Sequence, residues 1–106
     1  MITIIADERT YAIKAIGHAG FAKKGTDIVC AAVSVLLYTY AFELMNLKRS
    51  PIINDIDTYV EVIPTKVEED ERIVLIVFNT ILQGLHLVAD DYEDHVKLEI
   101  NKWREQ

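Results

Sequence analysis

Residues 17–34 read GHAGFAKKGTDIVCAAVS and separate a strand region before them from a long apolar helix after them. Three of the four glycines lie here, at positions 17, 20 and 25, and glycine gives the backbone its greatest conformational freedom. The segment Gly17–Thr26 is therefore predicted to be a mobile loop. Thr26 or Asp27 can cap the following helix, an apolar run from Ile28 to Leu47 that Arg49-Ser50-Pro51 closes.

Period-two alternation on the N-terminal side of this loop predicts a hairpin. Ile2 and Ile4 alternate before the polar segment 6–10, and Tyr11 and Ile13 alternate after it. On the C-terminal side, 57–63 alternates and 72–78 is apolar and β-branched, so we predict a second hairpin with an acidic turn between them.

Helical spacing returns over 79–90, where Gly84 is expected to allow close packing against the first helix. Val96, Leu98 and Ile100 then alternate with polar residues and predict a final strand. The expected fold is one α+β domain spanning 1–106, with a mainly antiparallel sheet, two helices and the order ββαββαβ.

The first helix is apolar on nearly every side, so the sheet and either a second helix or another subunit should cover it. Core packing is the preferred interpretation of Tyr38, Tyr40 and Phe42, with a substrate groove or a dimer face as alternatives. The longest apolar stretch, from Ile28 to Phe42, is interrupted by Ser34 and Thr39 and is shorter than the roughly 20 residues that cross a bilayer, which favours a buried helix.

Composition narrows the possible functions. The chain is 51% apolar and 26% charged, which is typical of a globular domain, and its single cysteine excludes a disulfide scaffold. A net charge of -6 disfavours nucleic acid and favours a basic partner. Residues 1–7 lack a basic segment followed by a long apolar one, so export is not expected and a cytoplasmic location is predicted, where the thiol stays reduced.

Cys30 and His18 are the candidates for chemistry. Cys30 lies in the first turn of the predicted helix, where unpaired N–H groups and the helix dipole stabilise a thiolate; packing is the alternative role. His18 lies on the other side of the glycine loop, which can fold back to join the two side chains. Such a pair transfers acyl groups, whereas a histidine between glycines can also be a simple turn residue.

Neighbouring groups have two possible roles each. Asp27 can cap the helix or orient the His18 imidazole, and Ser34, one turn after Cys30, can hydrogen-bond near the thiol or to a helix carbonyl. Backbone N–H groups of Cys30 and of Ala19 or Gly20 are candidate oxyanion donors.

Two further histidines and an acidic cluster carry no predicted chemistry. His86 and His95 have no ligand spacing and are interpreted as surface or packing residues. The acidic segment 90–94 lacks the ligand period of a calcium loop, so it is expected to be a solvated turn. No metal or cofactor is predicted.

The segment 17–34 contains a histidine, an aspartate, a cysteine and a serine with glycines between them: His18, Asp27, Cys30, Ser34. This pattern resembles the signature of the ribosomal-processing cysteine proteases of bacteria, the Prp family. The resemblance implies that Cys30 is the nucleophile and His18 the general base, with Asp27 and Ser34 supporting them. It also implies a loop that closes over the substrate and contains Gly17, Ala19, Gly20, Phe21 and Gly25.

Members of this family are cytoplasmic homodimers that remove a short N-terminal extension from protein twenty-seven of the large ribosomal subunit, after an apolar and aromatic stretch. The resemblance therefore implies a ribosomal protein precursor as the peptide substrate and no direct role for nucleic acid or membrane. Two alternatives stay open: a non-catalytic ribosome-associated binding module in which Cys30 packs, and a thiol-dependent acyl-transfer enzyme with a non-peptide substrate.

Overall fold

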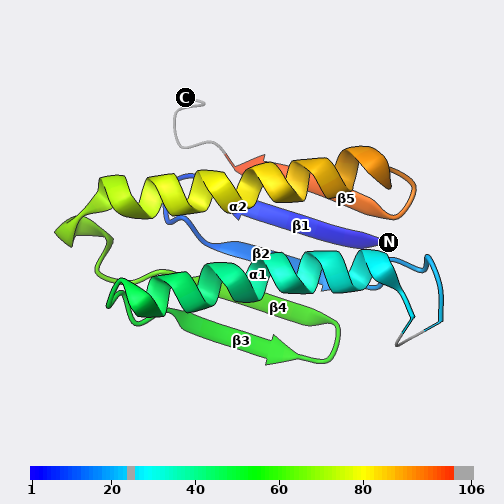
Figure 1. Cartoon of the computed structure of the whole chain (residues 1–106), viewed down its shortest axis with the longest axis horizontal. Helices are drawn as coiled ribbons and strands as arrows, with labels where there is room; N and C mark the ends of the chain where they lie inside the picture. Colours follow the sequence, from blue (N-terminus) through cyan, green and yellow to red (C-terminus); the bar gives the residue numbers. More distant parts are fainter. Residues whose placement is uncertain (24–25, 102–106) are drawn as a thin grey trace.

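A computed structural model describes residues 1–23 and 26–101, in which the elements follow the predicted order (Figure 1). They are β1 (Ile2–Asp7), β2 (Ile13–Gly17), α1 (Ile28–Asn46), β3 (Ile52–Ile56), β4 (Tyr59–Ile63), the short 3-10 turn η1 (Val67–Glu69), α2 (Glu71–Asp91) and β5 (Val96–Asn101). The α+β class and the order ββαββαβ are confirmed. Between β2 and α1, the described residues form a loop, also as predicted.

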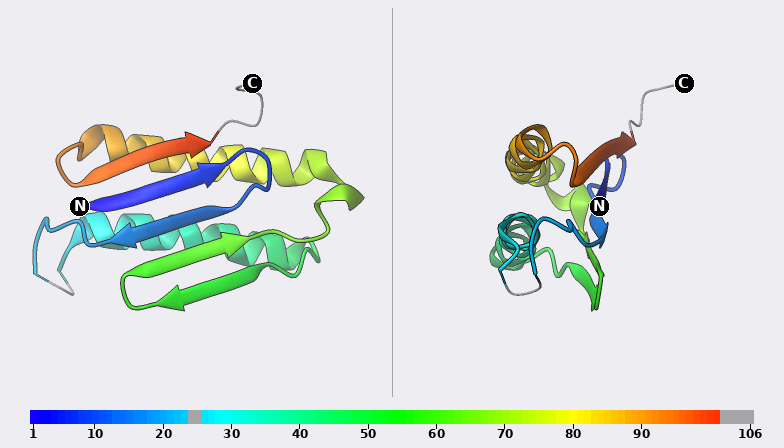
Figure 2. Two further views of the ribbon diagram at one scale, coloured as in Figure 1. Left: turned by 180° about the vertical axis from the view of Figure 1, so that it is seen from behind. Right: turned by 90° about the vertical axis from the view of Figure 1, so that its right-hand side faces the viewer.

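The sheet has the strand order β3-β4-β2-β1-β5, and both helices cover the same face of it (Figure 2). β1–β2, β2–β4 and β3–β4 are antiparallel pairs, which confirms a mainly antiparallel sheet. β5 pairs with β1 in parallel, with Ile2 opposite Val96. This parallel pair exists because α2 carries the chain back across the sheet before β5 begins.

The core lies between the helices and the covered face of the sheet. Alternate strand residues such as Ile4 and Ile13 are fully buried there, and α1 contributes one face that includes Leu37 and Leu44. Burial of each such side chain stabilises the fold by roughly 1.5–3 kcal/mol. Tyr40 is also buried and its hydroxyl donates to the Tyr11 carbonyl at 2.6 Å, so core packing is confirmed for this tyrosine.

Core packing was the wrong expectation for Phe42, which is 59% exposed on the outer side of α1, and Tyr38 is half-buried. The inner sides of α1 and α2 do meet closely. A Cβ on Gly84 would lie 2.7 Å from Leu36 Cδ2, which confirms close helix packing at this glycine.

The predicted strand over 72–78 is wrong, because these residues form the start of α2. Their β-branched composition favours a strand locally, but the buried residues continue at helical spacing across the predicted boundary: Val74, Phe78, Ile81, Leu82, Leu85. The hairpin partner of β4 instead precedes it, with Ile52 opposite Ile63. This strand, β3, lies at the sheet edge and is mostly exposed, so its sequence shows no alternation.

The expectation that α1 is too short to cross a bilayer is wrong. α1 has 19 residues with a mean hydropathy of 1.9, and α2 has 21 with 1.7, so both are long and apolar enough to cross a bilayer. In the structure the two helices pack against each other and against the sheet, with α1 contacting β2 and β4, and α2 contacting β5. This packing buries 33% of the apolar window of α1 and 28% of that of α2.

Gly17→Ala is expected to destabilise the fold. Gly17 has a φ of +103°, and a Cβ there would lie 2.5 Å from the Met1 carbonyl oxygen, a backbone atom that cannot rotate away. We expect a loss of about 2 kcal/mol or more in the free energy of unfolding, measurable as a Tm lower by about 10 °C.

Gly20→Ala is the matched control for this prediction. Gly20 also has a positive φ, +69°, but a Cβ there would meet nothing within 4 Å. Its replacement measures backbone strain alone, so an equal loss of stability in the two variants would contradict the predicted clash at Gly17.

Candidate active site

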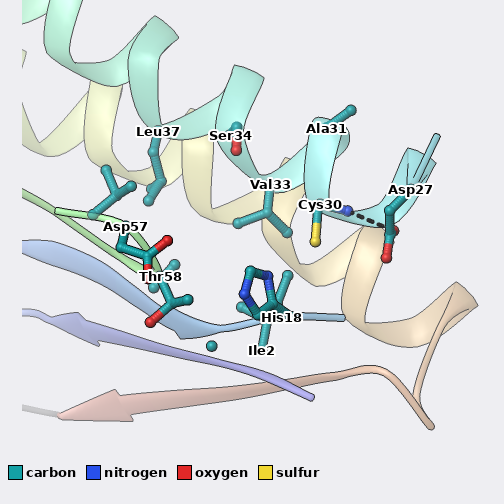
Figure 3. Close-up of a pocket in the computed structure, with 13 residues that line it drawn as sticks. Ile2, His18, Asp27, Cys30, Ala31, Val33, Ser34, Leu37, Asp57 and Thr58 are labelled. Carbon is teal, nitrogen blue, oxygen red and sulfur yellow. Dashed lines mark hydrogen bonds between the residues drawn. The ribbon is translucent and has the colours of Figure 1, made fainter. Parts of the chain in front are cut away.

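A pocket of about 340 Å³ lies beside the start of α1, and the residues singled out in the sequence lie around it (Figure 3). His18, Cys30 and Ser34 all line it, as does Asp27. Its apolar walls come from β1, β2, β4 and α1: Ile2, Ala15, Val33, Leu37, Val60. The pocket therefore combines a reactive thiol and an imidazole with surfaces suited to an apolar side chain.

Cys30 is half-buried in the first turn of α1, as predicted. Its Sγ accepts a hydrogen bond from the Ala19 N–H at 3.4 Å, so the glycine loop folds back onto the thiol. The sulfur points into the pocket, toward the side that holds the His18 ring (Figure 3). The thiol therefore lies at the helix N-terminus with one backbone N–H group directed at its sulfur.

His18 directly follows β2 and is exposed, with its ring directed toward α1 (Figure 3). It shares the pocket with Cys30, although within the described residues no hydrogen bond joins the two side chains. The sequence prediction that the loop brings this pair into one site agrees with the geometry.

Asp27 is buried and caps α1. Its Oδ1 accepts from the N–H groups of Val29 and Cys30, both at 3.0 Å, while Oδ2 accepts from Phe21 at 3.0 Å and Ala22 at 3.3 Å. Among described residues it has no hydrogen bond with His18, so of its two possible roles the structure contains the cap. The same carboxylate also attaches the glycine loop to the helix.

The pKa of Asp27 is held below its ordinary value of 3.8 by the N–H groups that it accepts, that of Cys30 first, against the opposing effect of burial. Its charged form therefore stabilises the folded state at all pH values above about 3.8, and this contribution disappears as the pH falls through the lowered pKa.

Asp27→Asn is expected to remove that dependence. The stability difference between the native protein and this variant should be constant from pH 7 to 5 and shrink below pH 3.8, because the native side chain becomes neutral too. Urea unfolding of both proteins at each pH measures it. A difference that stays constant down to pH 2 would contradict the assigned role of the carboxylate.

The remaining predicted residues take different positions. Ser34 lines the pocket one turn after Cys30, and in the described part of the chain it bonds neither to the thiol nor to a helix carbonyl. Of the candidate oxyanion donors, the Cys30 N–H is directed at Asp27 and the Ala19 N–H at the sulfur. Gly17 lines the pocket, whereas Gly25 lies outside the described residues.

The sequence did not indicate two residues that contact the loop and two at the far end of the pocket. His95 and Tyr92, from the turn between α2 and β5, contact Phe21 edge-on, and His95 also bonds to the Ala19 carbonyl. Asp57 and Thr58 reach the pocket from the β3–β4 turn. No local pattern marks these residues, because only the sheet topology brings their turns to the loop.

Metal chemistry has no support in the geometry. Within residues 1–23 and 26–101, no three His, Cys, Asp or Glu side chains gather as a set of ligands.

A thiol and an imidazole facing one pocket are the groups that cysteine-dependent acyl-transfer enzymes use, and the chain is a cysteine protease. It belongs to the Prp family, whose model, described as cysteine protease Prp, matches residues 1–97. The predicted family and enzyme class are thereby confirmed. No curated protein sequence matches the chain.

Solved structures share the fold over nearly the whole chain. The essential ribosomal processing protease Prp from Staphylococcus aureus, in complex with a covalently linked product peptide, is 24% identical with a TM-score of 0.82 and covers 95% of this chain and 100% of its own. The same protease in complex with a substrate peptide is 23% identical with a TM-score of 0.73, and the match covers 94% of this chain and 97% of its own. SMU.848 from Streptococcus mutans is 27% identical with a TM-score of 0.71, and the match covers 95% of this chain and 92% of its own.

Proposed function

We propose that this cysteine protease removes the N-terminal extension from the precursor of protein twenty-seven of the large ribosomal subunit, with Cys30 as nucleophile and His18 as general base. One observation carries the proposal: the Cys30 sulfur, already approached by the Ala19 N–H, faces a pocket that His18 shares. The Staphylococcus aureus Prp structures with substrate and covalently linked product peptides support a peptide substrate.

In the proposed reaction, His18 accepts the thiol proton while Cys30 Sγ attacks the scissile carbonyl carbon. The carbonyl π electrons move to oxygen, and a backbone N–H group donates to the resulting oxyanion. When the intermediate collapses, the C–N bond breaks and His18 returns the proton to the leaving amine. Water, deprotonated by His18, then hydrolyses the thioester and releases the free thiol.

The pocket walls support the expected cleavage after an apolar and aromatic stretch. Val33, Leu37 and Val60 offer apolar surface in the same pocket as the thiol, where an apolar substrate side chain is desolvated. The net charge of -6 supports a basic precursor, because opposite charges increase the rate of encounter at low salt. These two features act at different ranges: charge attracts the partner and the pocket selects the residues that bind.

Asp27 supports the reaction in this proposal by holding the loop and the helix terminus, and Ser34 by offering a hydroxyl to the bound peptide. We also propose that the enzyme acts as a homodimer in the cytoplasm. Apolar side chains exposed along α1 support a subunit interface: Ile28, Val35, Phe42, Met45.

Mass spectrometry of the precursor after incubation with the protein tests the proposed function. We expect one new N-terminus within the extension, and no cleavage after iodoacetamide treatment of the enzyme. An intact precursor with active, folded protein would reject this substrate, and cleavage that survives complete alkylation of Cys30 would reject the nucleophile.

A further inference from the structure

His95 connects the turn before β5 to the loop whose Ala19 N–H contacts Cys30. Its Nδ1 lies 2.8 Å from the Ala19 carbonyl oxygen, and its ring meets the Phe21 ring edge-on at 5.4 Å. The turn between α2 and β5 lies at the same end of the molecule as the glycine loop (Figure 1). Two segments far apart in the sequence thus meet beside the thiol.

The direction of this hydrogen bond follows from the partner. A backbone carbonyl only accepts, so Nδ1 carries the proton and donates it. His95 itself is held by the backbone, because its carbonyl accepts from the Ile2 N–H at 2.9 Å and its N–H donates to the Tyr92 carbonyl at 2.8 Å. The donor is therefore anchored to β1 and can fix the loop against the body of the domain.

The peptide between Ala19 and Gly20 has two accessible orientations. In a trans peptide the C=O and N–H groups point in opposite directions, so the bond to His95 directs the Gly20 N–H away from this histidine. A half-turn of that peptide would move φ of Gly20 from +69° to a negative value, which glycine also adopts at little cost. The hydrogen bond of His95 favours one orientation of the two.

Ala19 connects the orientation of this peptide to the position of the Cys30 sulfur. Its side chain is buried, and its N–H donates to Cys30 Sγ at 3.4 Å from the peptide directly before the one that His95 holds. Asp27 holds the next part of the loop through the N–H groups of Phe21 and Ala22. His95 and Asp27 therefore restrain the loop on both sides of Gly20.

We propose that His95 is a positioning residue that holds the Ala19–Gly20 peptide in the orientation required for reaction at Cys30. It keeps the Ala19 N–H at the sulfur and the Gly20 N–H on the side of the loop opposite His95. The inference rests on the proposed role of Cys30. His95 acts through the loop backbone and does not itself exchange protons with the substrate.

Two substitutions with opposite expectations test this role. The amide nitrogen of Asn in His95→Asn can occupy the place of Nδ1, whereas that of Gln in His95→Gln reaches instead toward the place of Nε2. We expect His95→Gln to lower kcat for precursor cleavage about 10- to 100-fold with little change in KM, and His95→Asn to restore most of it. His86→Gln, at an exposed position on α2, is the matched control and should leave kcat unchanged.

A second measurement needs no substrate. Amide hydrogen exchange followed by NMR should show faster exchange of the Ala19 N–H in His95→Gln than in the native protein, and near-native exchange in His95→Asn. Tm values of the variants separate these local effects from unfolding.

Three outcomes would overturn the inference: native kcat and Ala19 exchange in folded His95→Gln, equal losses in folded His95→Gln and His95→Asn, or an effect on KM alone. Failure of the proposed function is recognised separately, because it would appear as cleavage that does not depend on Cys30. The exchange measurement would still report on the loop in that case.

Discussion

Cys30→Ala is expected to reduce cleavage of the precursor by about 10⁴-fold or more. Alanine cannot form the thioester, so the reaction loses its covalent route and keeps only substrate binding. Single-turnover cleavage followed by mass spectrometry measures the loss. Binding of the precursor should persist, because the apolar walls of the pocket are unchanged.

Leu87→Ala is the matched control for this variant. Leu87 belongs to α2, lies outside the pocket and is 67% exposed, so its replacement tests whether shortening an apolar helix side chain away from the thiol affects cleavage. Cys30→Ala should stay folded, since the thiol is only half-buried and alanine favours helix. Cleavage that continues unchanged in folded Cys30→Ala would contradict the assigned nucleophile.

His18→Gln is expected to lower kcat/KM for the peptide bond by about 10²- to 10⁴-fold, the range that general acid–base catalysis contributes. The imidazole is exposed, so the variant should keep its Tm. The loss should be smaller for an activated ester of the same peptide, because a phenolate leaves without the proton that an amine needs.

His86→Gln serves again as the control, because it makes the same replacement at an exposed site away from the pocket. An equal loss for amide and ester in His18→Gln would contradict proton donation to the leaving group. Native activity toward both substrates would remove His18 from the mechanism altogether.

The predicted helix and loop around Cys30 agree with the structure because their signals are local. Asp27 precedes an apolar run and caps it through N–H groups only two and three residues away. The glycines mark the loop for an equally local reason, since positive φ values at Gly17 and Gly20 favour a residue without a Cβ. Residues that meet through such short-range contacts can be assigned from the order of the chain.

The error over 72–78 has the opposite origin. β-branched residues such as Val74 favour a strand in isolation, yet this valine is buried in the face of α2 that packs on the sheet. β3 was not predicted because this edge strand buries few side chains, so its sequence shows no alternation of apolar and polar residues. Both assignments depend on which surface a segment covers, a property of the assembled domain.

The order of amino acids was sufficient to identify the thiol, the imidazole and the capping carboxylate, because motif spacing and helix-end chemistry act over a few residues. Folding in three dimensions added the contacts of His95 with Ala19 and of Asp57 and Thr58 with the pocket. Sequence separation hides these contacts: His95 and Ala19 are 76 positions apart, and only the parallel pairing of β5 with β1 brings the turn before β5 to the glycine loop.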